Sequence, residues 1–224
     1  MRTNESSDVL REETFDITNP EVSVSTVSSD VRILESLDGK CHIEVRGRSD
    51  RAKNLAESVE ITSTDRTLSI QVDRSHRRFG GFLGGGSADL KIDVRLPKAS
   101  SLKIKTVSAD VLVEPGVRLL DIGSVSGDLD VLHNPAGTCN LKTVSGDIST
   151  RTFSSCQYTL KSVSGDIKVL VAEGLEVDVD GKTVSGDLSS EISLNSNSEP
   201  SQANSEFVTI STSTVSGDFT LARN

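Results

Sequence analysis

The stretch Leu-Lys-Thr-Val-Ser-Gly-Asp-Ile at residues 141–148 contains a six-residue motif that recurs along the chain. Its template is Thr or Ser, Val, Ser, then Gly, Ala or Ser, then Asp and an apolar residue. Seven segments fit it: TVSSDV (26–31), TVSADV (106–111), SVSGDL (124–129), TVSGDI (143–148), SVSGDI (162–167), TVSGDL (183–188) and TVSGDF (214–219). Internal repetition on so narrow a template indicates a repeat architecture, in which one structural unit is stacked several times.

The spacing of the motifs defines the size of this unit. From residue 106 onward the motifs start 18, 19, 19, 21 and 31 residues apart. The last interval exceeds 19 by 12, and it contains the 12-residue low-complexity stretch NSNSEPSQANSE at 195–206. The sequence therefore predicts a unit of about 19 residues, with a polar loop inserted into one copy.

The composition of the motif favours strands over helices. Leu141, Val144 and Ile148 have the spacing of a helical stripe, but Ser, Gly and Asp lie between them and Thr and Val are β-branched. Residues 102–106 alternate apolar and polar, as in a half-buried strand, and the next three residues break the pattern as a corner would. The unit that we predict is strand, corner, strand. The fold class is then all-β, with a repetitive β-solenoid, a stack like a β-helix, over 106–224.

The chain before the regular repeats has a different pattern. We predict a disordered tail over residues 1–13 and an N-terminal β region over 14–105 that caps the solenoid and is continuous with it. The elements expected in this region are a hairpin at 31–46 with Asp38-Gly39 as its turn, a helix at 50–58 with Asp50 as N-cap, a hairpin at 59–73, a Gly-rich loop at 77–87 and a strand at 88–96.

The charge is unevenly distributed over the 224 residues, whose formal net charge is −9. Residues 1–105 carry 17 basic and 17 acidic side chains, whereas residues 106–224 carry 7 and 16. Aromatic residues make up only 3% of the chain. Because phosphates require cations and exposed bases require stacking surfaces, we expect no nucleic-acid partner.

The sequence indicates neither membrane insertion nor export. No window approaches 18 consecutive apolar residues, and the first residues lack the apolar segment of a signal peptide. The three cysteines, Cys41, Cys139 and Cys156, fit neither a disulfide framework nor a CxxC zinc site. Cys139 and Cys156 are 17 residues apart, so they are not expected to stack in register. We expect a cytoplasmic protein with free thiols, no transmembrane segment, no metal and no cofactor.

Two features together resemble a known family. One is the ladder of Ser-Gly-Asp motifs. The other is the order of hairpin, basic Gly-rich loop and strand ending in Leu-Pro, within RRFGGFLGGGSADLKIDVRLPKASSLKIKTVSAD (77–110). Over roughly residues 14–222 the chain resembles the bacterial "putative adhesin" family of β-strand-repeat proteins, domain of unknown function 4097. The resemblance implies a repetitive all-β fold and supplies no reaction and no catalytic residues. Ser29 and Ala109 replace Gly in the first two motifs, so a different turn is expected there.

The corner residues recur once per repeat and are expected to be structural. They are Asp110, Asp128, Asp147, Asp166, Asp187 and Asp218, with Gly127, Gly146, Gly165, Gly186 and Gly217. Stacking would place neighbouring carboxylates about 5 Å apart, so each needs a partner. We expect each to accept backbone N–H bonds within its own corner, as in an Asx turn. The alternative is a row of Ca²⁺ sites, each of which would require several oxygen ligands.

Serines such as Ser124 and Ser126 could act as nucleophiles only with a base within hydrogen-bond reach. His133, the histidine within the repeats, adjoins the turn signal Asn134-Pro135, so an exposed loop position is expected. We expect the Ser and Thr columns to form hydroxyl ladders and to satisfy buried corner amides. No catalytic residue is predicted.

The Gly-rich loop carries the candidate partner-binding residues. It lacks the Gly-Lys-Ser/Thr ending of a P-loop and the spacing of a dinucleotide fingerprint. One interpretation is a solvated hairpin connection. The other is a loop that docks on a partner or a membrane surface through basic and apolar side chains: Arg77, Arg78, Phe79, Phe82 and Leu83.

These observations favour a non-enzymatic interaction or scaffold protein that binds another protein, or itself, through extended repetitive surfaces. A different interpretation is a carbohydrate-active β-helix enzyme, a polysaccharide lyase or hydrolase, which needs clustered carboxylates with Arg or Lys on one face and usually has aromatic side chains for sugar stacking. The acidic half has only three arginines, which counts against it. The sequence is also compatible with a calcium-binding repeat, with self-assembly through the strand edges at the solenoid ends, and with peripheral contact with a membrane.

Overall fold

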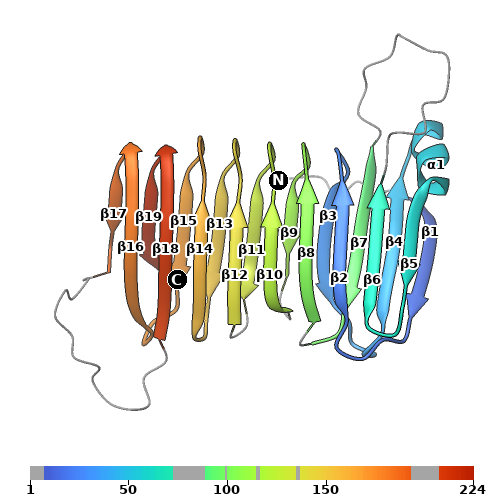
Figure 1. Cartoon of the computed structure of the whole chain (residues 1–224), viewed down its shortest axis with the longest axis horizontal. Coiled ribbons are helices and arrows are strands. Elements are labelled where there is room, and N and C mark those ends of the chain that lie inside the picture. The colour runs from blue at the N-terminus through green and yellow to red at the C-terminus, as the bar shows by residue number, and fades with distance from the viewer. Residues whose placement is uncertain (1–7, 73–88, 99, 115–116, 135–136, 193–206) are drawn as a thin grey trace, which may run out of the picture.

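The computed structural model describes residues 8–72, 89–98, 100–114, 117–134, 137–192 and 207–224. In these residues the chain forms two layers of β-sheet that face each other, with one short helix at one end (Figure 1). The long axis of the molecule runs across the strands, which is the direction in which the repeats stack.

The strands of the described residues fall into two sheets. The nine-stranded sheet has the spatial order β16 (Glu176–Ser185), β18 (Phe207–Ser216), β14 (Cys156–Lys161), β12 (Gly137–Lys142), β10 (Val117–Gly123), β8 (Ser100–Thr106), β2 (Glu21–Thr26), β6 (Thr67–Val72) and β5 (Val59–Ser63). The ten-stranded sheet has the order β1 (Asp8–Phe15), β4 (Cys41–Gly47), β7 (Leu90–Leu96), β3 (Asp30–Glu35), β9 (Val111–Val113), β11 (Leu129–Asn134), β13 (Ile148–Thr152), β15 (Ile167–Val171), β19 (Phe219–Arg223) and β17 (Leu188–Ser190).

Each repeat contributes one strand to each sheet. The chain runs along β12, turns at residues 143–147 and returns along β13 in the other sheet. The next repeat follows the same path with β14 and β15, and the equivalent strands pair in parallel, with Leu141 opposite Leu160 and Ile148 opposite Ile167. The predicted strand–corner–strand unit and the all-β solenoid are therefore confirmed.

The inward-facing side chains of the two sheets form one apolar core. Leu141 and Leu160, which belong to one column of this core, are both 0% exposed. The narrow space between two sheets, about 10 Å, suits Val, Ile and Leu better than aromatic rings. Tyr158 is a fully buried exception; its hydroxyl accepts a hydrogen bond from Thr150 Oγ1 (3.3 Å), and burial raises its pKa.

The last two repeats stack in the reverse of their order in the sequence. β18 lies between β14 and β16, and β19 lies between β15 and β17. The connection from β15 to β16, residues 172–175, therefore passes over one strand position. Two strand spacings are about 10 Å, which four extended residues can cross. The stretch 195–206, predicted as a loop inserted into one repeat, lies outside the described residues.

The first motif, residues 26–31, also belongs to the stack. It joins β2 to β3, and these strands pair directly with β8 and β9 of the next motif. The described residues between these two repeats form β4 to β7 and the helix α1 (Asp50–Glu57). We call β1, β4, β5, β6, β7 and α1 the N-terminal cap.

The hairpin predicted at 31–46 is wrong. Gly39, with φ of 77°, lies in the expected turn, but β3 and β4 do not pair with each other. β7 lies between them, parallel to β3 and antiparallel to β4. A turn signal indicates a chain reversal but does not choose the strand's partner, and here a strand from later in the chain takes that place. The hairpin at 59–73 is confirmed, because β5 and β6 pair antiparallel.

The helix predicted at 50–58 is confirmed, but its N-cap is Ser49 rather than Asp50. Ser49 has extended backbone angles, and its side chain accepts a hydrogen bond from the N–H of Ala52 (3.1 Å). Asp50 is already in the first helical turn, where a carboxylate interacts favourably with the helix dipole. The strand predicted at 88–96 is confirmed as β7.

The prediction of disorder over residues 1–13 is wrong for residues 8–13. They belong to β1, which pairs antiparallel with β4 and brings Phe15 opposite Cys41. The charged sequence of β1 lacks the apolar alternation by which a strand is predicted. The segment is nevertheless a strand, because its backbone pairs with the edge of an existing sheet and Arg11 forms an ion pair with Glu13. Residues 1–7 lie outside the described residues.

We predict that Leu141→Ala lowers the free energy of unfolding by about 2–5 kcal/mol, because it leaves a cavity in a core with no exposure to solvent. Lys142→Ala, at the next and exposed position, is the control and should change it by less than about 0.5 kcal/mol. Denaturant unfolding followed by circular dichroism measures both. Equal effects of the two substitutions would contradict the assignment of the core.

The three cysteines provide a second prediction. Cys41, Cys139 and Cys156 are buried, and Cys139 lies opposite Tyr158 rather than Cys156, as the 17-residue spacing predicted. Burial raises the pKa of Cys41 to about 11 and that of Cys139 well above its usual value. Because the thiolate is the reactive form, alkylation of the native protein at pH 8 should be slow and should become fast in denaturant. Rapid alkylation of Cys139 in the native state, detected by mass spectrometry, would contradict this burial.

Candidate interaction surface

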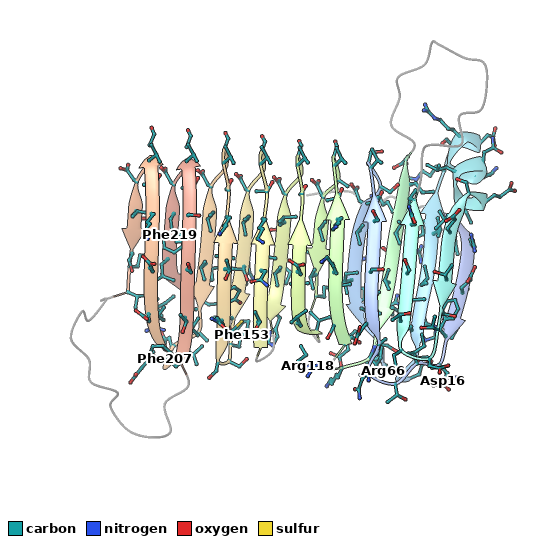
Figure 2. All side chains as sticks on the ribbon, in the orientation of Figure 1. Asp16, Arg66, Arg118, Phe153, Phe207 and Phe219 are labelled. Carbon is teal, nitrogen blue, oxygen red and sulfur yellow. The ribbon has the colours of Figure 1, made fainter. Side chains whose placement is uncertain are left out.

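The corners stack into a continuous row along one edge of the solenoid, drawn at the top of Figure 2. The N–H of Ser126 donates to the carbonyl of Val107 (2.7 Å), and the N–H of Gly127 donates to the carbonyl of Ser145 (3.2 Å). Parallel bridges join the motif serines in the order Ser108, Ser126, Ser145, Ser164 and Ser216. The backbone ladder therefore continues through the corner and fixes the position of every corner side chain.

The motif glycine is required by close backbone approach. Gly146 has φ of 146°, and a Cβ atom there would lie 2.3 Å from the carbonyl oxygen of Gly127. The same contact, at 2.1–2.3 Å, would arise at the other motif glycines: Gly127, Gly165, Gly186 and Gly217. Among the described non-glycine residues only Asn19 has positive φ, so Ser29 and Ala109 adopt a different turn, as predicted.

The motif aspartates form a ladder between repeats. The N–H of each aspartate donates to Oδ1 of the aspartate before it in the stack: Asp128 to Asp110 (3.0 Å), Asp147 to Asp128 (3.0 Å), Asp166 to Asp147 (2.8 Å), Asp218 to Asp166 (2.9 Å) and Asp187 to Asp218 (2.9 Å). The prediction that each carboxylate binds its own corner is therefore wrong. In-register stacking brings the amide of the next repeat within reach, while neighbouring amides of the corner are already used by the backbone ladder.

The ladder starts in the first repeat. The N–H of Asp110 lies 3.4 Å from Oδ1 of Asp30, and burial raises the pKa of Asp30. Among the described residues, no group of three or more His, Cys, Asp or Glu side chains is arranged to hold a metal ion. In the described stack, each motif carboxylate that is bonded thus accepts from the backbone amide of one neighbouring motif aspartate.

The motif valine points outward at the tip of each corner. Five successive corners of the stack present valines with nearly equal exposed fractions: Val107 (48%), Val125 (49%), Val144 (48%), Val163 (46%) and Val215 (48%). We call these five residues the valine ridge. Neighbouring members are separated by about one strand spacing, 4.8 Å, so the ridge is a continuous apolar line and not a set of isolated side chains.

Two charged rows flank the valine ridge. On the ten-stranded side lie the aspartates of the ladder. On the nine-stranded side lies one column of outward-facing positions that includes four exposed lysines: Lys105, Lys142, Lys161 and Lys182. We call these the lysine row. The edge therefore presents three parallel rows that are basic, apolar and acidic.

A column of hydroxyls lies beneath the valine ridge. Its members are buried and have no hydrogen-bond partner among the described residues: Thr106, Ser124, Thr143, Ser162 and Thr214. The predicted hydroxyl ladder is therefore wrong for this column. In the part of the chain that the structure describes, such a side chain caps an amide in the first repeat, where Thr26 Oγ1 accepts from the N–H of Ser29 (3.0 Å).

Two groups of predicted residues remain, the Gly-rich loop and His133. The loop residues Arg77, Arg78, Phe79, Phe82 and Leu83 fall outside the described residues. His133 stacks on Phe153, with ring centroids 4.6 Å apart, and Figure 2 places Phe153 at the edge opposite the corners. The structure therefore does not bring His133 to the motif serines. Sequence reasoning missed the valine ridge, although its outward position follows from a valine next to the corner in every motif.

The described residues contain one helix, α1, and its eight residues are too few to cross a bilayer.

The comparisons with known proteins identify a family. A family model described as Toastrack DUF4097 matches residues 19–123 and 117–222, which confirms the resemblance found in the sequence. No curated protein matches the chain.

Solved structures from several bacteria match this chain. A "putative cell adhesion protein" from Clostridium sporogenes is 8% identical with a TM-score of 0.58, over 96% of this chain and 99% of that one. A "putative adhesin" from Bacteroides fragilis is 13% identical with a TM-score of 0.39, over 94% and 96% of the two chains. A "putative lipid binding protein" from Parabacteroides distasonis is 13% identical with a TM-score of 0.39, over 93% and 96%. At these identities the likeness concerns the fold alone, and only the first has a TM-score above 0.5.

We predict that Gly146→Ala lowers the free energy of unfolding by at least about 2 kcal/mol, because the new Cβ strains the backbone and overlaps the carbonyl oxygen of Gly127. Gly123→Ala is the matched control, since nothing lies within 4 Å of its Cβ position. Thermal unfolding by calorimetry compares the two variants. A Gly146→Ala protein as stable as Gly123→Ala would show that the corners do not require the close approach.

Proposed function

Because the chain belongs to the Toastrack DUF4097 family, a family of β-strand-repeat folds, we propose that it is a non-enzymatic interaction scaffold that binds another protein along the valine ridge. The observation that carries this proposal is the row of five valines, each 46–49% exposed, at successive positions of one rigid edge. Single exposed apolar residues are normal on protein surfaces, whereas contiguous apolar surface is characteristic of interaction sites.

The flanking charges define the chemistry of the partner. The aspartate ladder favours Lys or Arg on one side of the bound surface, and the lysine row favours Asp or Glu on the other. The matching partner surface is an apolar strip, in a groove or along an extended segment, with basic groups on one flank and acidic groups on the other. A partner oriented in reverse would meet like charges on both flanks, so the rows also impose a direction.

The magnitudes indicate how the binding energy is divided. Full burial of a valine contributes about 1.5–3 kcal/mol, so covering the exposed half of each of five valines contributes roughly 5 kcal/mol. Association costs about 4–15 kcal/mol in lost freedom. The valine ridge alone therefore supports weak binding, and the charged rows must add both affinity and specificity. Binding should accordingly weaken as salt rises.

Further observations support an interaction role over carbohydrate chemistry. A sugar-cleaving site needs a pair of carboxylates at the scissile bond, usually beside aromatic side chains on which the sugar stacks. Phe153 and Phe207, which are 41% and 44% exposed, lie at the edge opposite the aspartate ladder (Figure 2). The fold is also that of the "putative cell adhesion protein" from Clostridium sporogenes, whose description is itself an interaction role. A reducing compartment such as the cytoplasm suits three buried thiols that form no disulfide.

The test compares two triple variants in affinity capture from native lysate. Val125→Ser, Val144→Ser and Val163→Ser together remove the centre of the valine ridge. The control is Val9→Ser, Leu119→Ser and Leu132→Ser, which removes three similarly exposed apolar side chains elsewhere. A specific partner should be retained by the control, should be lost by the ridge variant, and should be released by raised salt. Circular dichroism checks that both variants are folded.

Two outcomes would contradict the valine ridge as the binding site. One is retention of the partner by the ridge variant at unchanged affinity. The other is loss of the partner, or of binding to anionic liposomes, only in the loop variant Phe82→Ser, Leu83→Ser, which would move the function to the Gly-rich loop.

A further inference from the structure

We propose that the chain forms a two-fold symmetric dimer in which the outer edge of β16 pairs antiparallel with the same edge of a second copy. This inference is independent of the valine ridge, because it concerns the end of the stack rather than its long edge. It rests on the contrast between the two ends of the solenoid, on the exposure of the last repeat, and on the charges along β16.

The end formed by the N-terminal cap is closed. Helix α1 contacts β1, β4 and β7, and it buries Ala52 and Ala56 (Figure 1). The Arg11 guanidinium donates to the carbonyl oxygen of Val59 (2.5 Å), and so ties β1 of one sheet to the start of β5 in the other. A helix and charged side chains over terminal strands are devices by which proteins prevent edge-to-edge pairing.

The opposite end carries no such cover among the described residues. β16 and β17 are the terminal strands of the two sheets, and no described strand pairs with their outer edges (Figure 1). β16 has ten residues, so it offers a long row of backbone donors and acceptors. A long edge that no described helix or strand covers can serve as a template for pairing with another chain.

The side chains of the last repeat are exposed where their equivalents are buried. Leu188 is 50% exposed, whereas its neighbour in the stack, Phe219, is 4% exposed. Val179 is half-buried, whereas its neighbour Ile210 is 0% exposed. At the corner, Val184 is 82% exposed, well above the 46–49% of the valine ridge. This repeat thus has the inward pattern of a stacked unit and lacks one neighbour.

The charges of Asp180 and Lys182 favour a second copy as that neighbour and favour one register of pairing. With Gly181 on a two-fold axis perpendicular to the sheet, residue 180 of one copy lies opposite residue 182 of the other. Asp180 then faces the second copy's lysine at position 182, and this occurs twice. Both side chains are well exposed, 73% for Asp180 and 78% for Lys182, and their own ion pair is long at 3.8 Å. Centring the axis on Asp180 instead would pair Asp178 with the second copy's lysine at position 182, but it would place the two Asp180 side chains directly opposite each other.

The same register matches the inner faces. Directly opposite residues of an antiparallel pair project to the same face of the sheet. Val179 would therefore lie opposite the second copy's threonine at position 183, both on the side of the apolar core. Two cores would join, and the two valine ridges would lie on opposite edges of the dimer.

The experiment measures the mass of the full chain by light scattering and sedimentation over a concentration series. The wild type should change from the 23.9 kDa monomer to twice that mass as concentration rises. Asp180→Lys alone and Lys182→Asp alone should each raise the dissociation constant at least tenfold, because each places like charges face to face. An equimolar mixture of these two variants should restore the dimer, since the Lys pair of one then faces the Asp pair of the other. The double variant Asp180→Lys, Lys182→Asp should also dimerise.

Lys161→Asp is the matched control, because it makes the same charge change in the lysine row at a strand that is paired on both sides. It should leave the dissociation constant unchanged. The proposal is overturned by a wild type that stays monomeric, by open-ended filaments, or by a dimer that the two single variants do not weaken. A chain that dimerises only when residues 195–206 are deleted would overturn it too, because that stretch would then occupy the edge.

Discussion

The structure depends on the close approach of stacked corner backbones. At five motif glycines a Cβ atom would lie 2.1–2.3 Å from the carbonyl oxygen of the neighbouring corner. Because no side chain intervenes, the parallel ladder passes from one sheet through the corner into the other without a break. This continuity holds the repeats in register, and register in turn places every valine at the tip and every aspartate beside the next amide.

The same constraint explains how an acidic solenoid tolerates a row of aspartates. Carboxylates one strand spacing apart repel each other, and the whole net charge of −9 arises from residues 106–224. Each bonded carboxylate accepts an amide hydrogen from the next repeat, and charge-assisted bonds of this type are stronger than those between neutral groups. Four lysines on the other flank of the valine ridge add an opposite field. The motif aspartate therefore contributes to stacking as well as to the charge of the surface.

Repetition also creates the problem of how to end the stack. At one end the chain departs from the repeat and builds α1 and antiparallel strands, with Arg11 joining the two sheets. At the other end the repeat stops with β16 and β17, and its inward-facing residues keep the pattern of a stacked unit. The surface along the corners and the surface at the open end thus have separate origins. The surface along the corners comes from the motif itself, and the surface at the open end arises because the stack of repeats stops at β16 and β17.

The sequence by itself determined the repeating unit. The β-branched and glycine-containing motif predicted strand, corner, strand, and the helix at 50–58 and the hairpin at 59–73 followed from local signals. Tertiary structure decided which strands meet. β7 lies between β3 and β4, and β18 lies between β14 and β16. Each bonded aspartate carboxylate accepts from an amide of the next corner rather than of its own. The reason is physical. A motif encodes the conformation of its own residues, whereas equivalent repeats offer equivalent edges, so only the folded stack determines which edge each strand takes.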